Sequence, residues 1–164
     1  MILSDEEIER LLALPKTISN PKARRKVQKK SMRINYTVLA EGAAFEVYVR
    51  QNQLVADAFS CGLTYLPQSG DKVTLMRCNG PYHPHGNPLE GVSTIGVCCH
   101  IHKATHRYMV AGRKPEHYAE PTNLYSDVNG ALLTLMDQCN ITGLDIKSAD
   151  PYQNDLFPNC DDQS

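Results

Sequence analysis

Apolar and polar residues alternate with a period of two through most of the middle of the chain. Five segments show this pattern, which is typical of half-buried strands: RINYTVLA (33–40), AFEVYVRQ (44–51), FSCGLTYL (59–66), KVTLMRC (72–78) and TIGVCCHIHKA (94–104). Gly42, the segment PQSGD and the long segment NGPYHPHGNPLEG separate several of them, as turns and loops do. The order predicts a curved antiparallel meander of about five strands.

A helical period precedes these strands. In LSDEEIERLLALP, Ile8, Leu11 and Leu12 form an apolar stripe, and Pro15 ends the segment. Ser4 can cap this helix, because a glutamate three residues later completes a capping box.

A second helical pattern follows the strands in DVNGALLTLMDQCN. Its apolar residues run from Val128 to Met136 along one side, and Ser126 is a candidate cap. Residues 105–112 suit a short helix or a turn. Two helices beside one sheet predict an α+β fold, with the N-terminal and C-terminal helices packed on one face.

Four regions divide the chain. We expect an N-terminal helix in residues 1–16, a basic arm in 17–33, one α+β domain in 34–146 and an irregular C-terminal tail in 147–164. A length of 164 residues suits one domain with one core.

Composition narrows the class of protein. No apolar run approaches the roughly 20 residues that span a bilayer, and the acidic start of the chain does not suit a secretory signal. Six cysteines are scattered without a CxxC pair, which favours reduced thiols. These observations indicate a cytoplasmic protein without a membrane partner.

Charge is distributed unevenly. Residues 1–33 carry nine basic against four acidic side chains, and residues 34–164 carry eight against fourteen. Most of the excess comes from Lys22, Arg24, Arg25, Lys26, Lys29, Lys30 and Arg33. Such an arm is suited to neutralising phosphates, so nucleic acid is a candidate partner. The alternative is a solvated linker that pairs with the acidic body.

Candidate chemistry concentrates in VCCHIHKATH, residues 97–106. In a strand, alternate side chains share a face. The apolar face would hold Val97, Cys99 and Ile101, and the other face Cys98, His100 and His102. The last three would then form a row of metal-capable and proton-carrying groups.

A second polar cluster lies in the preceding loop, RCNGPYHPHGNP. The strand before this loop should pair antiparallel with the histidine strand. The pairing would bring Arg77, Asn79, His83, His85 and Asn87 beside His100 and His102. Its prolines stiffen the loop, and its glycines permit close approach of a ligand.

Three interpretations of this constellation stay open. In the first, zinc is bound by a subset of His83, His85, His100, His102 and Cys98, although neither paired CxxC nor HExxH is present. In the second, no metal is needed: His85 and either His100 or His102 act as acid and base, Arg77 or Arg107 stabilises a phosphate, and Asn79, His83 and Asn87 shape the site. In the third, the histidines are structural or form a binding surface without chemistry.

A family resemblance is carried by LMRCNGPYHPHGNPLEG, HIHKATHRY and a helix ending in DQCNIT. In these motifs the chain resembles an uncharacterised family of small bacterial and phage or mobile-element proteins. The resemblance covers about residues 45–142 and places Arg77, His85, Asn87, His100 and His102 at matching positions. It implies no activity, and by association a role in defence, counter-defence or as a toxin.

The leading hypothesis is a small nucleic-acid-processing protein, a metal-independent ribonuclease with the basic arm and Arg107 as its nucleic-acid anchors. This hypothesis involves no resident cofactor. The alternative is that the protein binds zinc. Two other classes remain: a non-catalytic inhibitor that occupies a nucleic-acid or protein surface, and a structural zinc protein. Nothing in the sequence indicates a substrate or an oligomeric state.

Overall fold

A computed structural model describes residues 1–68 and 70–146, so the predicted tail at 147–164 lies outside the described residues. The first half of the chain forms α1 (Asp5–Ala13), β1 (Lys16–Ile18), β2 (Lys26–Gln28), β3 (Ser31–Ala40), β4 (Ala43–Asn52), β5 (Phe59–Leu66) and β6 (Val73–Asn79). The second half forms the 3₁₀ helix η1 (Pro88–Glu90), β7 (His100–Lys103), α2 (His106–Val110), β8 (Ala119–Pro121), α3 (Val128–Gln138) and β9 (Ile141–Thr142).

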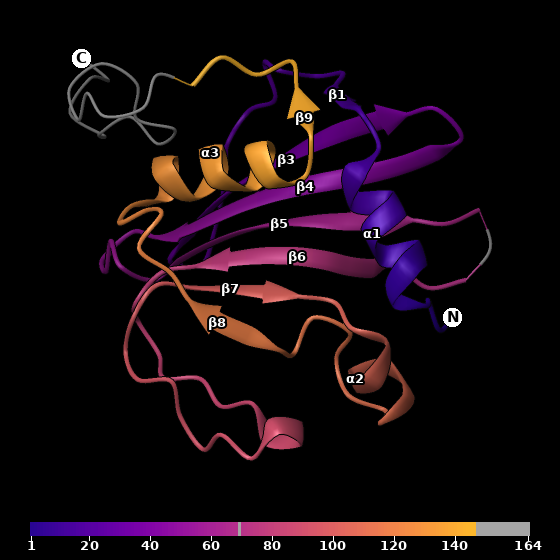
Figure 1. Ribbon diagram of the computed structural model, residues 1–164. Coiled ribbons are helices and arrows are strands. Elements are labelled where there is room, and N and C mark those ends of the chain that lie inside the picture. The colour runs from indigo at the N-terminus through magenta and orange to yellow at the C-terminus, as the bar shows by residue number, and fades with distance from the viewer. Residues whose placement is uncertain (69, 147–164) are drawn as a thin grey trace.

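One open sheet organises the molecule (Figure 1). Its strand order is β8-β7-β6-β5-β4-β3-β1-β9, with β2 paired to β3. All pairs are antiparallel except β1 with β9. The predicted meander is confirmed as β3 to β7. The sheet is larger than predicted because four strands of two or three residues extend it, and such short strands show no readable period.

Both longer helices cover the same face of the sheet, as predicted (Figure 1). The covered face is apolar because alternate residues of each strand point toward the helices, such as Val38 of β3, Val47 of β4 and Cys61 of β5, all fully buried. At the start of α1, the Ser4 side chain accepts from the backbone N–H of Glu7, so the predicted capping box is confirmed.

The cap of α3 differs from the prediction. Asp127, not Ser126, accepts a hydrogen bond from the backbone N–H of Gly130 at 2.7 Å. An ionised carboxylate also interacts favourably with the positive end of the helix dipole, which a serine hydroxyl does not match.

The fifth predicted strand is much shorter than expected. It begins at His100, and residues 94–99 belong to the loop before it. Gly96 takes a left-handed φ of 86°, which interrupts an extended segment. Val97 is 64% exposed, so its predicted place in the core is wrong, whereas Cys99 is buried as predicted.

The segment expected as a basic arm, residues 17–33, contributes β1, β2 and the start of β3 to the sheet. Cys61, Cys78, Cys98, Cys99 and Cys139 have free thiols. Within the described residues, every helix is too short or too polar to cross a membrane.

Candidate functional site: a three-histidine cluster on the open sheet face

The sheet face away from the helices carries the polar residues of the meander in cross-strand rows, and two of these rows lead to β7. Antiparallel pairing places cross-strand partners on the same face. One row runs Arg33, Arg50, Ser60, Asn79, His100, and the next runs Asn35, Tyr48, Gly62, Arg77, His102. Both rows end in a histidine of β7, so this strand places two imidazoles at one end of the open face.

His85 completes a cluster with these two residues. Each of the three histidines offers one ring nitrogen, and these nitrogens all lie within 4.8 Å of one another. The His85 ring centroid is 4.6 Å from that of His102 and 5.6 Å from that of His100. His100 and His102 are buried, and His85 is half-buried in the loop between β6 and β7. The predicted meeting of the loop with the histidine strand is therefore present.

Backbone carbonyls hold all three rings in place. Nδ1 of His100 lies 2.8 Å from the carbonyl oxygen of Cys98, and Nδ1 of His102 lies 2.9 Å from that of Glu116. Nε2 of His85 lies 2.7 Å from the carbonyl oxygen of His117. A carbonyl only accepts, so each of these ring nitrogens must be the protonated donor. The other nitrogen of each neutral ring then carries a lone pair.

Burial keeps these rings uncharged. It lowers the pKa of His102 to about 2, with the positive charge of Arg77 as the next largest cause. Burial also lowers the pKa values of His85 and His100. An imidazolium in this place would lose its hydration and face a guanidinium. At neutral pH the cluster is therefore a set of three neutral imidazoles.

Arg77 is the charged neighbour of the cluster. Its Nη2 is 3.3 Å from Nε2 and 3.4 Å from Nδ1 of His102. The two ring nitrogens are almost equally far from this guanidinium nitrogen, so Arg77 lies against the His102 ring without a short, directed hydrogen bond to either nitrogen. Its Nη1 pairs with the buried carboxylate of Glu116 at 3.4 Å. Asn79 Nδ2 lies 3.4 Å from His102 Nε2, at the outer limit of a hydrogen bond.

The loop that carries His85 is fixed by Asn87, which is predicted from sequence to shape the site. The buried Asn87 side chain accepts from the backbone N–H of Ala119 at 3.0 Å and donates to the Ala119 carbonyl at 2.8 Å. The side-chain amide of Asn87 thus makes the two hydrogen bonds to β8 that a neighbouring strand would otherwise make. Gly86 beside it has no room for a side chain, because a Cβ would lie 2.5 Å from the Ser93 carbonyl oxygen.

Other predicted site residues lie apart from the cluster. His83 is exposed, with its ring against Tyr82 at 4.3 Å between centroids. Cys98 is half-buried, and its Sγ lies 3.6 Å from the carbonyl oxygen of Ile95. The expectation that Cys98 shares a strand face with the histidines is wrong, because the strand begins after it. Arg107 pairs with Glu90 at 2.6 Å.

The cluster opens into a groove along the sheet face. The cleft at the cluster has a volume of about 430 Å³ and is lined by His85, His100, His102 and also by Arg33, Arg50 and Arg77. Two neighbouring clefts share these arginines: one of about 370 Å³ shares all three, and one of about 420 Å³ shares Arg77. The groove is thus continuous across β3 to β7.

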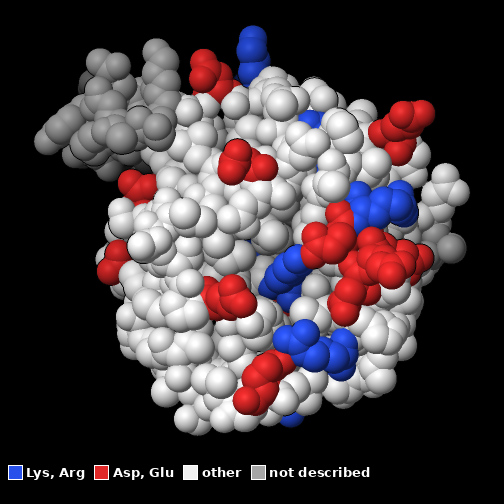
Figure 2. Space-filling model, viewed as in Figure 1, with Lys and Arg blue, Asp and Glu red and all other residues white. Residues whose placement is uncertain are grey.

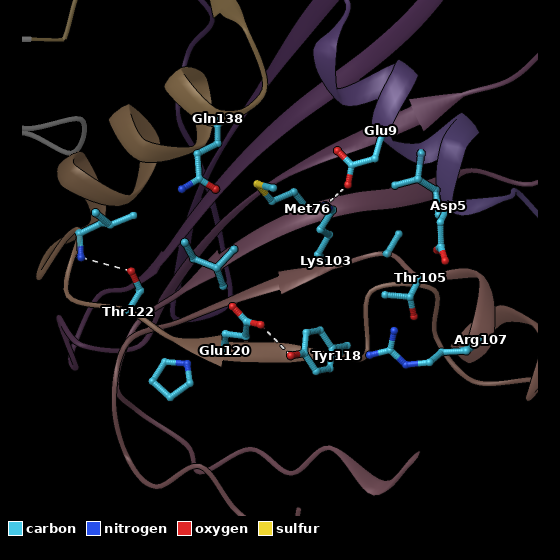
Figure 3. A pocket seen from close by; sticks show the side chains of 15 residues that line it. Asp5, Glu9, Met76, Lys103, Thr105, Arg107, Tyr118, Glu120, Thr122 and Gln138 are labelled. Atoms are coloured by element: carbon cyan, nitrogen blue, oxygen red, sulfur yellow. Dashed lines mark hydrogen bonds and ion pairs between the residues drawn. The ribbon is translucent and has the colours of Figure 1, made fainter. Parts of the chain in front are cut away.

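A larger cleft of about 550 Å³ lies on the helix side of β7 (Figure 3). There Lys103 pairs with Glu9, and Tyr118 donates to Glu120 at 2.7 Å. This cleft holds none of the three histidines, because His100 and His102 point to the opposite face from Ile101 and Lys103. The convergent, chemically competent groups lie in the smaller groove, so we place the candidate site there.

Sequence reasoning missed three contributors to the site. His117, which supplies the carbonyl for His85, and Glu116, which supplies that for His102 and pairs with Arg77, come from a loop without a readable period. Arg50 is one basic residue in a strand, and only the cross-strand register reveals its place in the row with Arg33.

Comparisons with known proteins add no relative: no protein-family model, no curated protein and no solved structure matches this chain.

Proposed function

We propose that His85, His100 and His102 bind one transition-metal ion, with zinc as the best fit, and that this ion activates water for hydrolysis. One observation carries the proposal: three neutral imidazoles each give one N–H to a backbone carbonyl, and one ring nitrogen from each of the three lies within 4.8 Å of the other two. Metal ligation needs the unprotonated nitrogen, and the second nitrogen of metal-bound histidines usually donates in this way.

The burial of the cluster supports the same conclusion. Metal affinity falls when protons compete for the ligands, and the lowered pKa values of all three histidines remove that competition at neutral pH. Zinc with nitrogen ligands at about 2.1 Å in a tetrahedron sets those nitrogens about 3.4 Å apart. The cluster therefore has to contract on binding. His85 is the ligand best placed to shift, because it is half-buried and lies outside the sheet, while β7 keeps the other two ligands in place.

Three protein ligands leave a fourth position for water, which is the arrangement of catalytic zinc sites. Asn79 Oδ1 is buried and has no hydrogen-bond partner among the described residues, so it can accept from a metal-bound water. The ion would lower the pKa of this water to about 7. In hydrolysis the hydroxide would add to the ester centre, the bond from that centre to the leaving oxygen would break, and that oxygen would take the hydroxide's proton.

The charge of the site favours an anionic substrate. The Arg77–Glu116 pair is neutral as a whole, and the histidines are uncharged. A bound divalent ion would leave an excess of positive charge beside a guanidinium, which an anionic ester would neutralise. A phosphate ester is the simplest substrate with that charge.

The metal-independent ribonuclease predicted from sequence is the second candidate. The position of Arg77 against His102 favours it, since a guanidinium beside a base is a suitable phosphate clamp. Its weak point is the general acid. His102, with a pKa of about 2, is not protonated at neutral pH, so the acid would have to be His85 or His100, whose pKa values burial also lowers.

Metal content separates the candidates. The purified chain is stripped with chelator, titrated with Zn²⁺ and Co²⁺, and assayed on bis(p-nitrophenyl) phosphate. We expect one equivalent of bound metal, a visible Co²⁺ spectrum typical of four-coordination, and hydrolysis that chelator abolishes. His85→Ala, a change at a half-buried loop residue, should weaken zinc binding by more than roughly 100-fold. His83→Ala, from the same loop, should bind zinc normally.

Other results would point elsewhere. Cleavage that survives chelator would support the metal-independent mechanism and overturn the metal proposal. Zinc whose removal unfolds the chain, measured by far-UV circular dichroism, would indicate a structural ion. Absence of binding by both wild type and His83→Ala would leave the histidines without a metal role.

A further inference from the structure

The open sheet face gathers positive charge around the histidine cluster. Eight basic side chains but only two acidic ones, Glu46 and Glu116, line the four clefts along this face that share Arg33 or Arg77. One of these two carboxylates already pairs with Arg77. The helix-covered face, by contrast, shows more acidic than basic side chains (Figure 2). The nearly neutral chain is therefore strongly polarised between its two faces.

The cations form a line that leads to the cluster. Arg33 and Arg50 are cross-strand partners, and the same row continues through Ser60 and Asn79 to His100. Four strand spacings of about 4.8 Å make this row about 19 Å long. Such a length suits several consecutive phosphates of an extended chain that crosses the strands.

Arg33 in this row and Arg77 in the neighbouring row each have an unused donor. The Nε atoms of Arg33 and Arg77 are buried and have no hydrogen-bond partner among the described residues. A buried donor without a partner is unfavourable, so an acceptor supplied by a ligand would stabilise both side chains. Planar guanidiniums bind phosphate oxygens in this way.

The floor and rim of the groove suit bases as well as phosphates. Tyr48 lies directly over Gly62, where a Cβ would be 2.5 Å from its hydroxyl oxygen, and Arg50 stacks on the Tyr48 ring at 4.8 Å. At the rim, the rings of Tyr82 and His83 are both exposed. Exposed aromatic rings beside a basic groove are the platform on which single-stranded bases stack.

We infer that this groove binds a single-stranded nucleic acid, whose phosphates lie along Arg33, Arg50 and Arg77. The inference rests on the proposed function in one respect: it places one phosphodiester of the bound strand at the metal centre. There a water activated by the ion would lose one proton to solvent and add to phosphorus as hydroxide; the bond from phosphorus to the leaving sugar oxygen would break, and that oxygen would take the hydroxide's proton.

Strand binding is measured first without metal, so that it is independent of the proposed function. Fluorescence anisotropy of labelled dT12 and U12 is followed in chelator at several salt concentrations, with a duplex of equal length and a poly-glutamate peptide as competitors. Each phosphate contact contributes about −0.7 to the slope of log K against log salt for single strands. Three arginine contacts predict a slope of about −2 or steeper.

The decisive variant is Arg33→Gln/Arg50→Gln. It should reduce the steepness of the slope by about 1.4 and weaken binding about 20-fold at 0.1 M salt. The control is Arg10→Gln/Arg107→Gln, which removes the same charge from residues that line none of the four groove clefts. The control should bind like wild type. The ratio of U12 to dT12 affinity then tells RNA from DNA.

Three results would overturn the inference: no binding of either oligonucleotide at 50 mM salt, equal weakening in both double variants, or competition by poly-glutamate or duplex as strong as by the single strand. Zinc titration of Arg33→Gln/Arg50→Gln keeps the two proposals apart, because this variant should bind zinc like wild type. If zinc binding fails while dT12 binding shows the expected slope, the inference that the groove binds a single strand is supported. The proposal that one phosphodiester is cleaved at the metal centre is then refuted.

Discussion

Acid should destabilise the metal-free protein through the buried histidines, and His102 dominates the effect. In the unfolded chain a histidine has a pKa of about 6.5, whereas burial holds that of His102 at about 2. Above pH 6.5 the His102 imidazole is neutral in both the folded and the unfolded chain, so it adds nothing to the pH dependence of the free energy of unfolding. Below pH 6.5 the unfolded chain takes up a proton that the folded chain does not, so the free energy of unfolding falls as pH falls.

The magnitude follows from the same two values. One pH unit with one proton of difference corresponds to about 1.4 kcal/mol, so lowering the pH from 7 to 5 should cost about 2 kcal/mol from His102 alone. His85 and His100 act in the same direction. The carboxyl groups of Glu7 and Glu90 have pKa values lowered from 4.5, so their contributions are lost below this window.

Urea unfolding in chelator, followed by far-UV circular dichroism at pH 7, 6 and 5, measures this directly. The sharpest control is His102→Asn, whose amide nitrogen can still donate to the Glu116 carbonyl but does not titrate. In this variant the free energy of unfolding should depend on pH by about one proton less than in the wild type. Equal stability at pH 7 and pH 5, or an unchanged dependence in His102→Asn, would refute the neutral buried cluster.

Three further outcomes are expected. Zinc at 100 times its dissociation constant should raise the free energy of unfolding by about 2.7 kcal/mol, seen as a higher midpoint in thermal unfolding, and His85→Ala should show little of this increase. Asn87→Ala removes both hydrogen bonds to Ala119, so it should lower the free energy of unfolding in urea by about 3 kcal/mol. Because it loosens the loop of His85, it should also weaken zinc binding in a Zn²⁺ titration by at least about tenfold. Lys16→Met should cost about 3 kcal/mol in the same unfolding assay, because the buried Lys16 ammonium donates to three backbone carbonyls at 2.8 Å.

The meander could be predicted because each long strand packs one face against helices, which forces a period of two. The short strands could not. β1, β8 and β9 span two or three residues, too few to show any period, and β2 is exposed throughout. They exist because tertiary packing places their backbones beside a sheet edge. Fold class is thus readable from local pattern, whereas sheet width depends on distant parts of the chain.

The histidine cluster was partly predictable for a related reason. Antiparallel pairing of β6 with β7 returns the end of the intervening loop to the strand, which made it reasonable to expect a histidine of that loop near His100 and His102. The conformation of the loops decides which other groups lie beside the cluster. The strand begins at His100, which leaves Cys98 outside the row, and residues 116–117 supply carbonyls whose role no side-chain pattern reveals.

The two faces of β7 explain why metal chemistry and strand binding would share one side of this protein. Ile101 points toward the helices and the core, which fixes the position of the strand. Alternation then obliges His100 and His102 to point into the groove, in the same rows as Arg50 and Arg77. Two ligands are held by the most rigid part of the fold, and the third comes from a loop pinned to β8. A bound ion would add positive charge at the end of the groove where a phosphate of the strand would lie, so strand binding and metal binding should strengthen each other.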